Sequence, residues 1–377
     1  MHPTAQSETS TLFLAFELSQ STWKLGFTTS TAQKPRRRTM KAGDLGALAQ
    51  ELASAKERFQ VAEEAQIVSC FEAGRDGFWL HRYLSEEAGI ENLVVDSSSI
   101  EVNRRHRRAK TDRLDVESLL RQLLRYQAGE RKAFSVVHVP SREAEDGRHL
   151  HREMEVLKHD QTRRANRIRG LLATQGVILK CVSKDFPEWL ETVRLWDGSA
   201  LGQDLKARLL RDYRHLAATR EDLRTLERQR QEALRNSEDP QVEKIRQLIR
   251  LRALGVNSSW LFVAEFFGWR EFTNRRQVGG LAGLTPTPYQ SGGSAREQGI
   301  SKHGNARLRA MMIEIAWCWL RFQPQSQLSR WYWERFGRSG TKRMRRVGIV
   351  ALARKLLVAL WRYLDQGVLP EGAVLKA

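Results

Sequence analysis

Residues 94–124 read VVDSSSIEVNRRHRRAKTDRLDVESLLRQLL and join an apolar run to a basic block and then to a leucine-rich helix. The basic side chains of the block are Arg104, Arg105, Arg107, Arg108, Lys110 and Arg113. Asp112 and Asp115 lie three residues apart at the start of the predicted helix, so both carboxylates leave the same helix face. Two carboxylates this close resist ionising together, unless a cation lies between them or arginines surround them. The stretch therefore predicts a metal site that faces a polyanion.

Size and charge restrict the partners of the chain. It has 377 residues, which suggests two or three domains, and a formal net charge of +19 with a pI near 10.3. Such a basic excess favours a polyphosphate partner, although a solvated basic surface remains an alternative. The three cysteines have no partner at metal-ligand spacing, and no apolar run reaches the ~18 residues of a membrane span. We expect a cytoplasmic protein with no membrane contact.

The first 140 residues have the pattern of an α/β domain. Strands are predicted at 11–18, 22–29, 35–40, 65–72 and 91–95, with helices at 44–59 and 78–88. Three leading strands followed by alternating helix and strand predict a sheet with a partly antiparallel edge. Glu17 and Glu72 end two of these strands, where sites form in open sheets, so they could converge with Asp112 and Asp115. Taken singly, each of these acids is more often a solvated strand end.

Residues 141–243 change character and predict a helical arm. Charged residues alternate with leucines at helical spacing, which is typical of long helices paired as an antiparallel coiled coil. Arg163, Arg164 and Arg167 form a basic stripe suited to tracking phosphates. A structural spacer or dimerisation arm is an equally good interpretation of this segment.

Residues 244–377 predict a second, mostly α-helical domain. Its start resembles a helix-hairpin-helix unit whose turn offers backbone N–H groups to phosphate. A glycine-rich stretch follows and carries Ser291 and Lys302, in a backbone flexible enough for close approach by a ligand. Ser291 could act as a nucleophile if a base or a metal activated it, although a serine in a turn is the commoner case.

Several short motifs, taken in order, resemble one known family. They are Glu17, Phe71-Glu72-Ala73-Gly74, Lys110-Thr111-Asp112-Arg113-Leu114-Asp115, Gly283-Leu284-Thr285-Pro286, Gln290-Ser291-Gly292 and Ile300-Ser301-Lys302-His303-Gly304-Asn305. In order and spacing they resemble the bacterial insertion-sequence transposases that combine a DEDD RuvC-like domain with a C-terminal serine domain, a family that includes the pilin-gene invertases. The match spans nearly the whole chain.

The resemblance implies a fold, a chemistry and a set of partners. It implies an RNase H-like (RuvC-like) domain, a coiled-coil arm and a helical C-terminal domain, in a recombinase that excises and inserts its mobile element. The four acids Glu17, Glu72, Asp112 and Asp115 would bind Mg²⁺ or another divalent cation such as Mn²⁺, and Ser291 would attack a DNA phosphodiester. A structured bridge RNA would pair with target and donor DNA, and the enzyme would act as a homodimer or homotetramer at the bacterial nucleoid.

One position departs from the family pattern. The family has aspartate at the first acidic position, where this chain has Glu17. The longer arm carries the same carboxylate, so it either keeps the site with altered geometry or weakens metal binding. Two other functions fit the same residues, namely a RuvC-like branched-DNA nuclease that uses metal-activated water and a non-catalytic nucleic-acid-binding protein.

Overall fold

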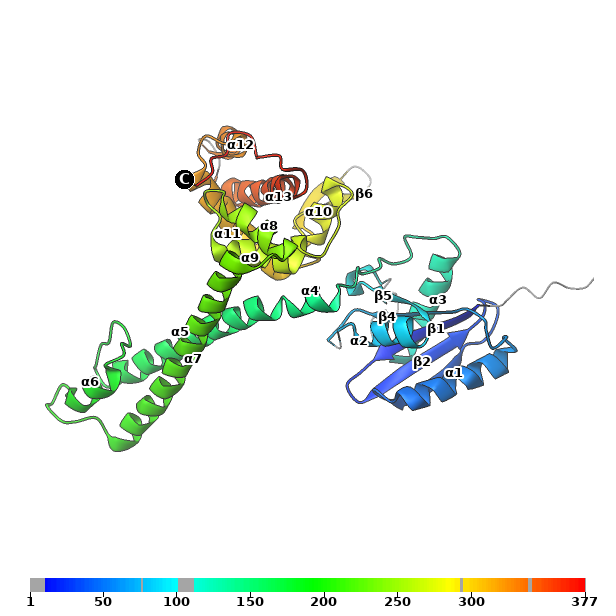
Figure 1. Cartoon of the computed structure of the whole chain (residues 1–377), viewed down its shortest axis with the longest axis horizontal. Coiled ribbons are helices and arrows are strands. Elements are labelled where there is room, and N and C mark those ends of the chain that lie inside the picture. Colours follow the sequence, from blue (N-terminus) through cyan, green and yellow to red (C-terminus); the bar gives the residue numbers. More distant parts are fainter. Residues whose placement is uncertain (1–10, 76, 101–111, 292–293, 338–340, 377) are drawn as a thin grey trace, which may run out of the picture. The chain divides into compact units, whose positions relative to one another are not determined.

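The computed structural model describes residues 11–75, 77–100, 112–291, 294–337 and 341–376, with backbone only for 112–114 and 288–298. The chain divides into two compact units, Met1–Val139 and Pro140–Ala377. In Figure 1 the colours run continuously from blue at the start of the first unit to red at the end of the second. The further boundary predicted after residue 243 falls inside the second unit and stays a prediction. In the described part of the chain, no helix is both long enough and apolar enough to cross a bilayer.

Among the described residues of the first unit, five strands form one mixed sheet. They are β1 (Leu12–Leu18), β2 (Thr22–Thr28), β3 (Arg36–Lys41), β4 (Ile67–Glu72) and β5 (Glu91–Val95). The strand order is β3-β2-β1-β4-β5, and the β1–β2 and β2–β3 pairs are antiparallel while the β1–β4 and β4–β5 pairs are parallel. The expected α/β sheet with an antiparallel edge is therefore confirmed.

Helices cover both faces of this sheet. The helices are α1 (Leu45–Phe59), α2 (Trp79–Arg82) with the π-helical turn η1 (Tyr83–Glu87), and α3 (Asp112–Gln127). Leu12, Leu14 and Phe16 of β1 pack in the cluster that includes α1 and α2, whereas Ala15 packs in the cluster that includes α3. Because side chains alternate along a strand, one face of the sheet belongs to α1 and α2 and the other belongs to α3.

Two contacts seat α3 on the antiparallel edge. Gly26 of β2 leaves room for the helix, since a Cβ at this position would lie 2.6 Å from Val116 Cγ1. At the edge strand, the Arg37 guanidinium pairs with the Glu117 carboxylate of α3. Gly26 lets α3 pack close to the sheet, and the Arg37–Glu117 ion pair sets which side of the helix faces the edge strand.

The second unit begins with two long antiparallel helices. It contains α4 (Arg142–Asp146), α5 (His149–Ala173), α6 (Phe186–Thr192) and α7 (Gln203–Asn236). Arg230 contacts Met154 near the start of α5, while Arg167 further along α5 contacts Asp212, so the two helices run in opposite directions, as Figure 1 shows. Phe186 of α6 packs between the far ends of the pair. An antiparallel helix pair is thus present, and the coiled-coil geometry itself stays a prediction.

The remaining helices pack around a large apolar core. They are α8 (Pro240–Ile249), α9 (Val256–Phe262) with the π-helical turn η4 (Val263–Phe267), α10 (Arg275–Leu281), α11 (Ala306–Phe322), α12 (Gln327–Phe336) and α13 (Lys342–Gln366). Trp319 of α11 and Tyr332 of α12 are fully buried, and so is Leu356 of α13. Most of the aromatic density in this unit therefore builds the core, although Trp333 keeps 47% of its surface exposed.

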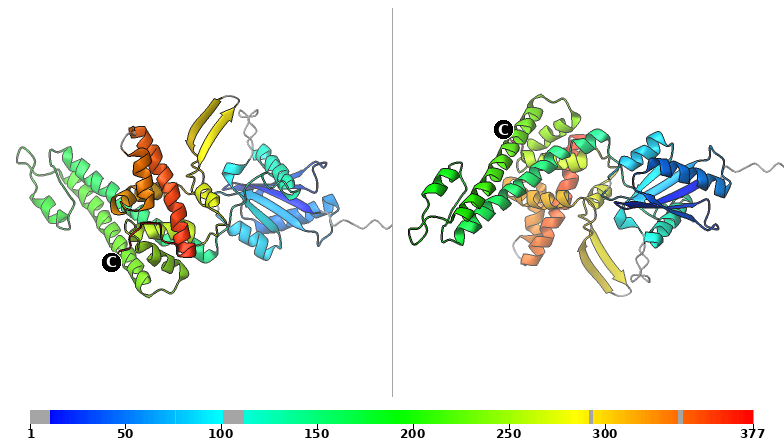
Figure 2. Two further views of the ribbon diagram at one scale, coloured as in Figure 1. Left: turned by 90° about the horizontal axis from the view of Figure 1, so that it is seen from above. Right: turned by 90° about the horizontal axis from the view of Figure 1, so that it is seen from below.

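The glycine-rich stretch differs from the flexible loop that the sequence predicts. It forms an antiparallel hairpin of β6 (Pro286–Ser291) and β7 (Ser294–Ile300), which stands out from the helices of its own unit in Figure 2. At its base, a Cβ on Gly283 would overlap the carbonyl oxygen of His303, and a Cβ on Gly304 would overlap that of Leu281. Both glycines have positive φ, so they serve a close backbone crossing within the chain rather than the approach of a ligand.

Candidate active site

Glu17 and Glu72 lie side by side at the carboxyl ends of two parallel strands. Phe16 of β1 pairs with Phe71 of β4, and the two glutamates follow in step. Neighbouring strands are about 4.8 Å apart, so the two Cα atoms are neighbours although 55 residues separate them in the sequence. Strand alternation puts both on the face of Ala15 and Cys70, which α3 covers. The sheet thus brings together the two acids that the sequence placed at strand ends.

Asp115 belongs to the helix that covers this face. It precedes Val116, which packs in the same cluster as Ala15, and it lies one turn before Leu119. The side chain of Asp112 lies outside the described residues. Among the side chains that the structure describes, no group of three or more His, Cys, Asp or Glu is close enough to hold a metal ion. The structure therefore gives two adjacent acids and a third on the overlying helix, and the four-acid metal site stays a prediction.

Lys24 is a neighbour of the acids that the sequence did not single out. It pairs in register with Glu17 across the antiparallel β1–β2 ladder, so both side chains leave the sheet on the same face. The position of Lys24 beside Glu17 can be deduced only when the register of the β1–β2 pair is known.

Local hydrogen bonds hold the carboxyl ends of β4 and β5 together. The Ala73 backbone N–H donates to the Val95 carbonyl at 2.8 Å, and the Ser97 hydroxyl donates to the Ala73 carbonyl at 2.9 Å. Asp96 closes the turn after β5 by accepting from the Ser98 backbone N–H at 2.9 Å. The chain leaving β4 is thereby fixed at the residue that follows Glu72.

Ser291 ends the first strand of the hairpin in the second unit. Its backbone pairs with that of Ser294, and its side chain lies outside the described residues. Lys302 is exposed at the base of the hairpin with a φ of 58°, and its backbone N–H donates to the Gly283 carbonyl at 3.2 Å. A positive φ is strained for a residue other than glycine. The surrounding contacts where the chain crosses at the base hold Lys302 in this conformation.

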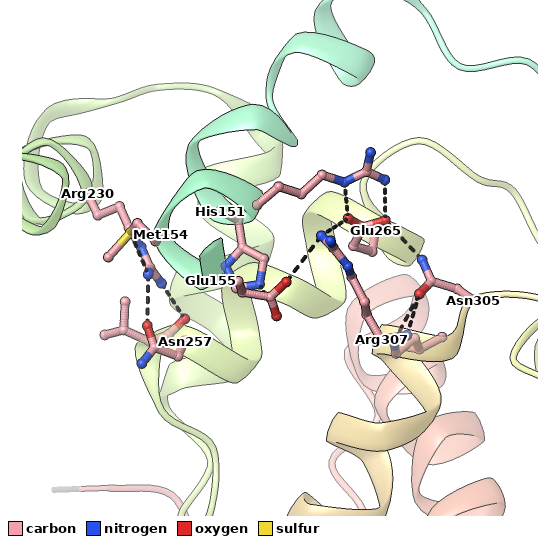
Figure 3. Close-up of polar contacts among 11 residues, drawn as sticks. His151, Met154, Glu155, Arg230, Asn257, Glu265, Asn305 and Arg307 are labelled. Atoms are coloured by element: carbon pink, nitrogen blue, oxygen red, sulfur yellow. Dashed lines mark hydrogen bonds and ion pairs between the residues drawn. The ribbon is translucent and has the colours of Figure 1, made fainter. Parts of the chain in front are cut away.

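A buried carboxylate anchors the hairpin base to the long helix α5. Glu265 of η4 is 2% exposed and accepts two hydrogen bonds from the Arg152 guanidinium, at 2.7 and 3.0 Å. The Asn305 amide donates to the same carboxylate at 2.9 Å, while its oxygen caps α11 by accepting from the backbone N–H of Arg307 (Figure 3). Burial acts to raise the pKa of Glu265, but the hydrogen bonds and charges of these partners outweigh it and the pKa is lowered. Glu265 therefore stays ionised.

A second polar contact continues the anchor along α5. Arg307 pairs with Glu155 at 3.1 Å, and Glu155 lies 3.5 Å from Nε2 of His151 (Figure 3). Burial is the main reason that the pKa of His151 is lowered to about 4, and the nearby Arg230 lowers it further. Arg230 is itself buried, donates to the Asn257 side chain at 2.8 Å, and lies over the Trp260 ring. Sequence reasoning did not single out these residues, because most of their contacts join segments that lie tens of residues apart in the chain.

Comparison with known proteins identifies the family of the chain. Residues 246–330 match the sequence model described as "Transposase IS116/IS110/IS902 family", a range that holds Glu265, the hairpin with Ser291, and Asn305. Across 376 residues the chain is 39% identical to the putative transposase y4rJ of Sinorhizobium fredii, covering 97% of this chain and 94% of that protein. The chain belongs to the IS116/IS110/IS902 transposase family.

More distant relatives cover about two thirds of this transposase-family chain. A probable family 20 transposase of Pseudomonas aeruginosa is 29% identical over 68% of the chain and 72% of its own length. The transposase for insertion sequence element IS1111A of Coxiella burnetii is 28% identical over 68% of the chain and 67% of its own length.

The predicted nucleic-acid contacts of this transposase-family chain have mixed placements. Arg104, Arg105, Arg107, Arg108 and Lys110 lie outside the described residues, and so does the side chain of Arg113. On α5, Arg163 pairs with Asp160 at 3.0 Å and Arg167 with Asp212 at 3.4 Å, while Arg164 is partly buried. Two of the three stripe arginines are therefore engaged within the chain. The Arg163–Asp160 pair is solvent-exposed and contributes little to stability, whereas the Asp212 carboxylate that pairs with Arg167 is buried.

Proposed function

We propose that this transposase is a metal-dependent DNA recombinase in which Ser291 is the nucleophile and a bridge RNA guides the choice of DNA. Family membership supports DNA transposition as the reaction class. The observation that carries the proposal furthest is the register of β1 and β4, which sets Glu17 beside Glu72 on the face that α3 covers. A central strand bearing the first acid, next to a parallel strand bearing the second, is the arrangement that an RNase H-like assignment requires.

The acids fit a divalent metal by their chemistry. Carboxylate oxygens are the ligands that Mg²⁺ and Mn²⁺ prefer, and Glu17, Glu72 and Asp115 supply them from two strands and one helix. Asp112, one turn of helix before Val116, would complete the set. When bound, such an ion polarises a phosphate and stabilises the charge that develops on its oxygens.

The serine chemistry conserves the energy of the DNA backbone. The Ser291 oxygen forms a bond to phosphorus, the bond from phosphorus to the leaving sugar oxygen breaks, and the hydroxyl proton passes to a base while the leaving oxygen takes up a proton. Because the phosphodiester is exchanged for a phosphoserine ester and not hydrolysed, a second sugar hydroxyl can reverse the step and join new strands without a high-energy cofactor. A nuclease that uses water would lose this energy.

Ser291→Ala tests the nucleophile, with Ser294→Ala as its matched control on the paired strand. Full-length protein with element-end DNA and its RNA is quenched in denaturant, and covalent protein–DNA adducts are separated by gel. We expect adducts with the unaltered protein and with Ser294→Ala, and none with Ser291→Ala. Continued cleavage by Ser291→Ala, with no adduct from any variant, would instead establish the water-using nuclease.

Glu72→Gln tests the acids, with Glu91→Gln as its control. Glu91 begins the neighbouring strand β5, at the opposite, amino end of the parallel strands, and accepts a hydrogen bond from Gln66. We expect Glu72→Gln to lower the rate of adduct formation by at least about 100-fold, the scale for loss of one electrostatic stabiliser, and Glu91→Gln to leave it unchanged. Equal rates for both variants would favour a non-catalytic sheet domain.

The guide RNA is tested by sequencing the nucleic acid that copurifies with the protein. A single discrete RNA from the end of the element supports guidance. Random fragments of cellular RNA would remove guidance from the proposal while leaving the serine chemistry intact.

A further inference from the structure

A cavity of about 660 Å³ in the second unit is lined by an excess of positive charge. It lies between α10, α13 and the segment 368–371 that follows α13. The cationic side chains that line it are Arg275, Arg276, Arg354, Lys355 and Arg362, and the single acid among its lining residues is Glu371. None of the predicted nucleic-acid contacts lies in this cavity.

Arg354 and Lys355 are positioned by small and aromatic neighbours. The aliphatic part of the Arg354 side chain packs on Gly279 of α10, where an added Cβ would lie 3.5 Å from Arg354 Cδ. The Lys355 ammonium lies 4.6 Å from the centre of the Trp331 ring. Within the described part of the chain, no carboxylate lies within ion-pair distance of any of the five. Five cations that share a cavity with a single carboxylate repel one another, so the arrangement indicates an anionic partner that binds there.

The spacing along α13 matches a polymeric anion. Arg354 and Arg362 are eight residues apart, which is about 12 Å along a helix axis. This is the axial length of three to four nucleotides at about 3.4 Å each. Between them, Val358 and Ala359 contribute small apolar side chains to the lining, and the described residues that line the cavity include no aromatic side chain that could stack on a base. The lining therefore suits a sugar–phosphate backbone better than a nucleotide or a nucleobase.

The cavity also adjoins the strand that carries the serine. Thr285 lines the cavity and is followed directly by β6, which ends at Ser291. Six residues of extended strand span about 20 Å, or about six base pairs of duplex. A backbone bound in the cavity would thus be held within one helical turn of the nucleotide that the serine attacks.

We propose that the cavity between α10 and α13 is a phosphodiester-backbone binding site that holds nucleic acid near the Ser291 hairpin. The ligand class rests on the function proposed above, but binding does not depend on Ser291 as nucleophile, so the two can fail separately. Duplex DNA and structured RNA present the same phosphodiester chemistry.

The test measures binding of full-length protein carrying Ser291→Ala, which separates binding from cleavage. A labelled 30-base-pair DNA duplex and a labelled RNA of equal length are titrated at salt concentrations from 50 to 300 mM. The cavity variant is Arg354→Gln with Arg362→Gln. The control is Arg321→Gln with Arg335→Gln, which makes the same charge change on α11 and α12, outside the cavity.

We expect the cavity variant to reduce the slope of log K against log salt by about 1.8 for duplex DNA, since each lost phosphate contact removes about 0.9. At 0.1 M salt this corresponds to a loss of affinity of about 60-fold. A loss with the duplex alone assigns the site to DNA, and a loss with the RNA alone assigns it to RNA. The proposal is wrong if cavity and control variants show equal slopes on both ligands, or if affinity falls with no change of slope.

A second variant tests whether a loss of binding could come from misfolding instead of from the lost charges. Arg275→Gln with Arg276→Gln alters exposed side chains of α10 on the opposite wall of the cavity. It should lower the salt slope by the same amount while leaving the melting temperature unchanged. An unchanged slope here, together with a lower melting temperature for the α13 variant, would also overturn the site.

Discussion

Replacing His151 should remove a pH-dependent loss of stability from the second unit. His151 lies on α5, is 4% exposed, and has no hydrogen-bond partner at either ring nitrogen within the described part of the chain. Burial, reinforced by the Arg230 guanidinium, lowers its pKa from 6.5 to about 4. The Glu265 carboxylate acts to raise the pKa of His151 but does not compensate, because Arg307 and Lys158 also lower it.

Stability falls as the pH is lowered, because the unfolded chain binds a proton at His151 at a higher pH than the folded chain does. As the pH falls below 6.5, the unfolded chain protonates its histidine while the folded chain does not, so this contribution to stability is full above 6.5 and is lost between 6.5 and about 4. The difference between a pKa of 6.5 in the unfolded chain and about 4 in the folded chain corresponds to about 3.4 kcal/mol, of which about 1.8 kcal/mol is lost between pH 7 and pH 5. The pKa of Glu265 is lowered, so the stability that its ionised carboxylate contributes is lost only at more acidic pH, below about 4.5.

Urea unfolding of the full-length chain at pH 7 and pH 5, followed by far-ultraviolet circular dichroism, measures the difference. His151→Leu keeps a side chain of similar size and cannot titrate, and His149→Leu makes the same change at an exposed position of the same helix. We expect the unaltered chain and His149→Leu to lose about 2 kcal/mol more than His151→Leu over this interval. If all three lose the same amount, His151 is protonated equally in both states and the reasoning from its burial is refuted.

Other predictions follow from close contacts. Arg152→Met leaves the buried Glu265 carboxylate without its two-point partner and should cost about 3 kcal/mol in urea unfolding, whereas Glu265→Gln, which removes the charge, should cost less. Gly304→Ala should lower the melting temperature and abolish adduct formation because its Cβ overlaps a backbone carbonyl, whereas Gly299→Ala, in open space with a φ of 89°, should cost only about 1 kcal/mol and keep activity. Gly26→Ala should push α3 off the sheet, cost about 2 kcal/mol and speed amide hydrogen exchange in α3; unchanged exchange would contradict this packing.

Local pattern was enough to place the elements of the first unit. Alternation predicted β1, β2 and β4 within two residues of their bounds, and Asp44 does cap α1 by accepting from the Ala47 backbone N–H at 2.9 Å. The same alternation of apolar and polar residues placed Glu17 and Glu72 at the ends of strands. These features depend on residues a few positions apart, which the sequence displays directly.

The hairpin in the second unit was harder to predict. Glycine, proline and serine between residues 283 and 304 indicated a flexible loop, but the cross-strand pairing of β6 with β7 outweighs those local preferences. The positive φ of Gly283 and Gly304 is explained by a backbone crossing whose two sides lie about 20 residues apart in the chain.

The sequence by itself determined the order of the elements, the basic charge and the identity of the acids and the serine. Tertiary structure alone decided which of them meet: the pairing of Phe16 with Phe71 puts two glutamates side by side, and the packing of α5 against η4 buries Glu265 between Arg152 and Asn305. Within the apolar run LFVAEFF, Glu265 has no local sign of its partners, which lie 113 and 40 residues away. Register and burial arise from the whole fold, because a strand or helix acquires its neighbours only when distant segments pack together.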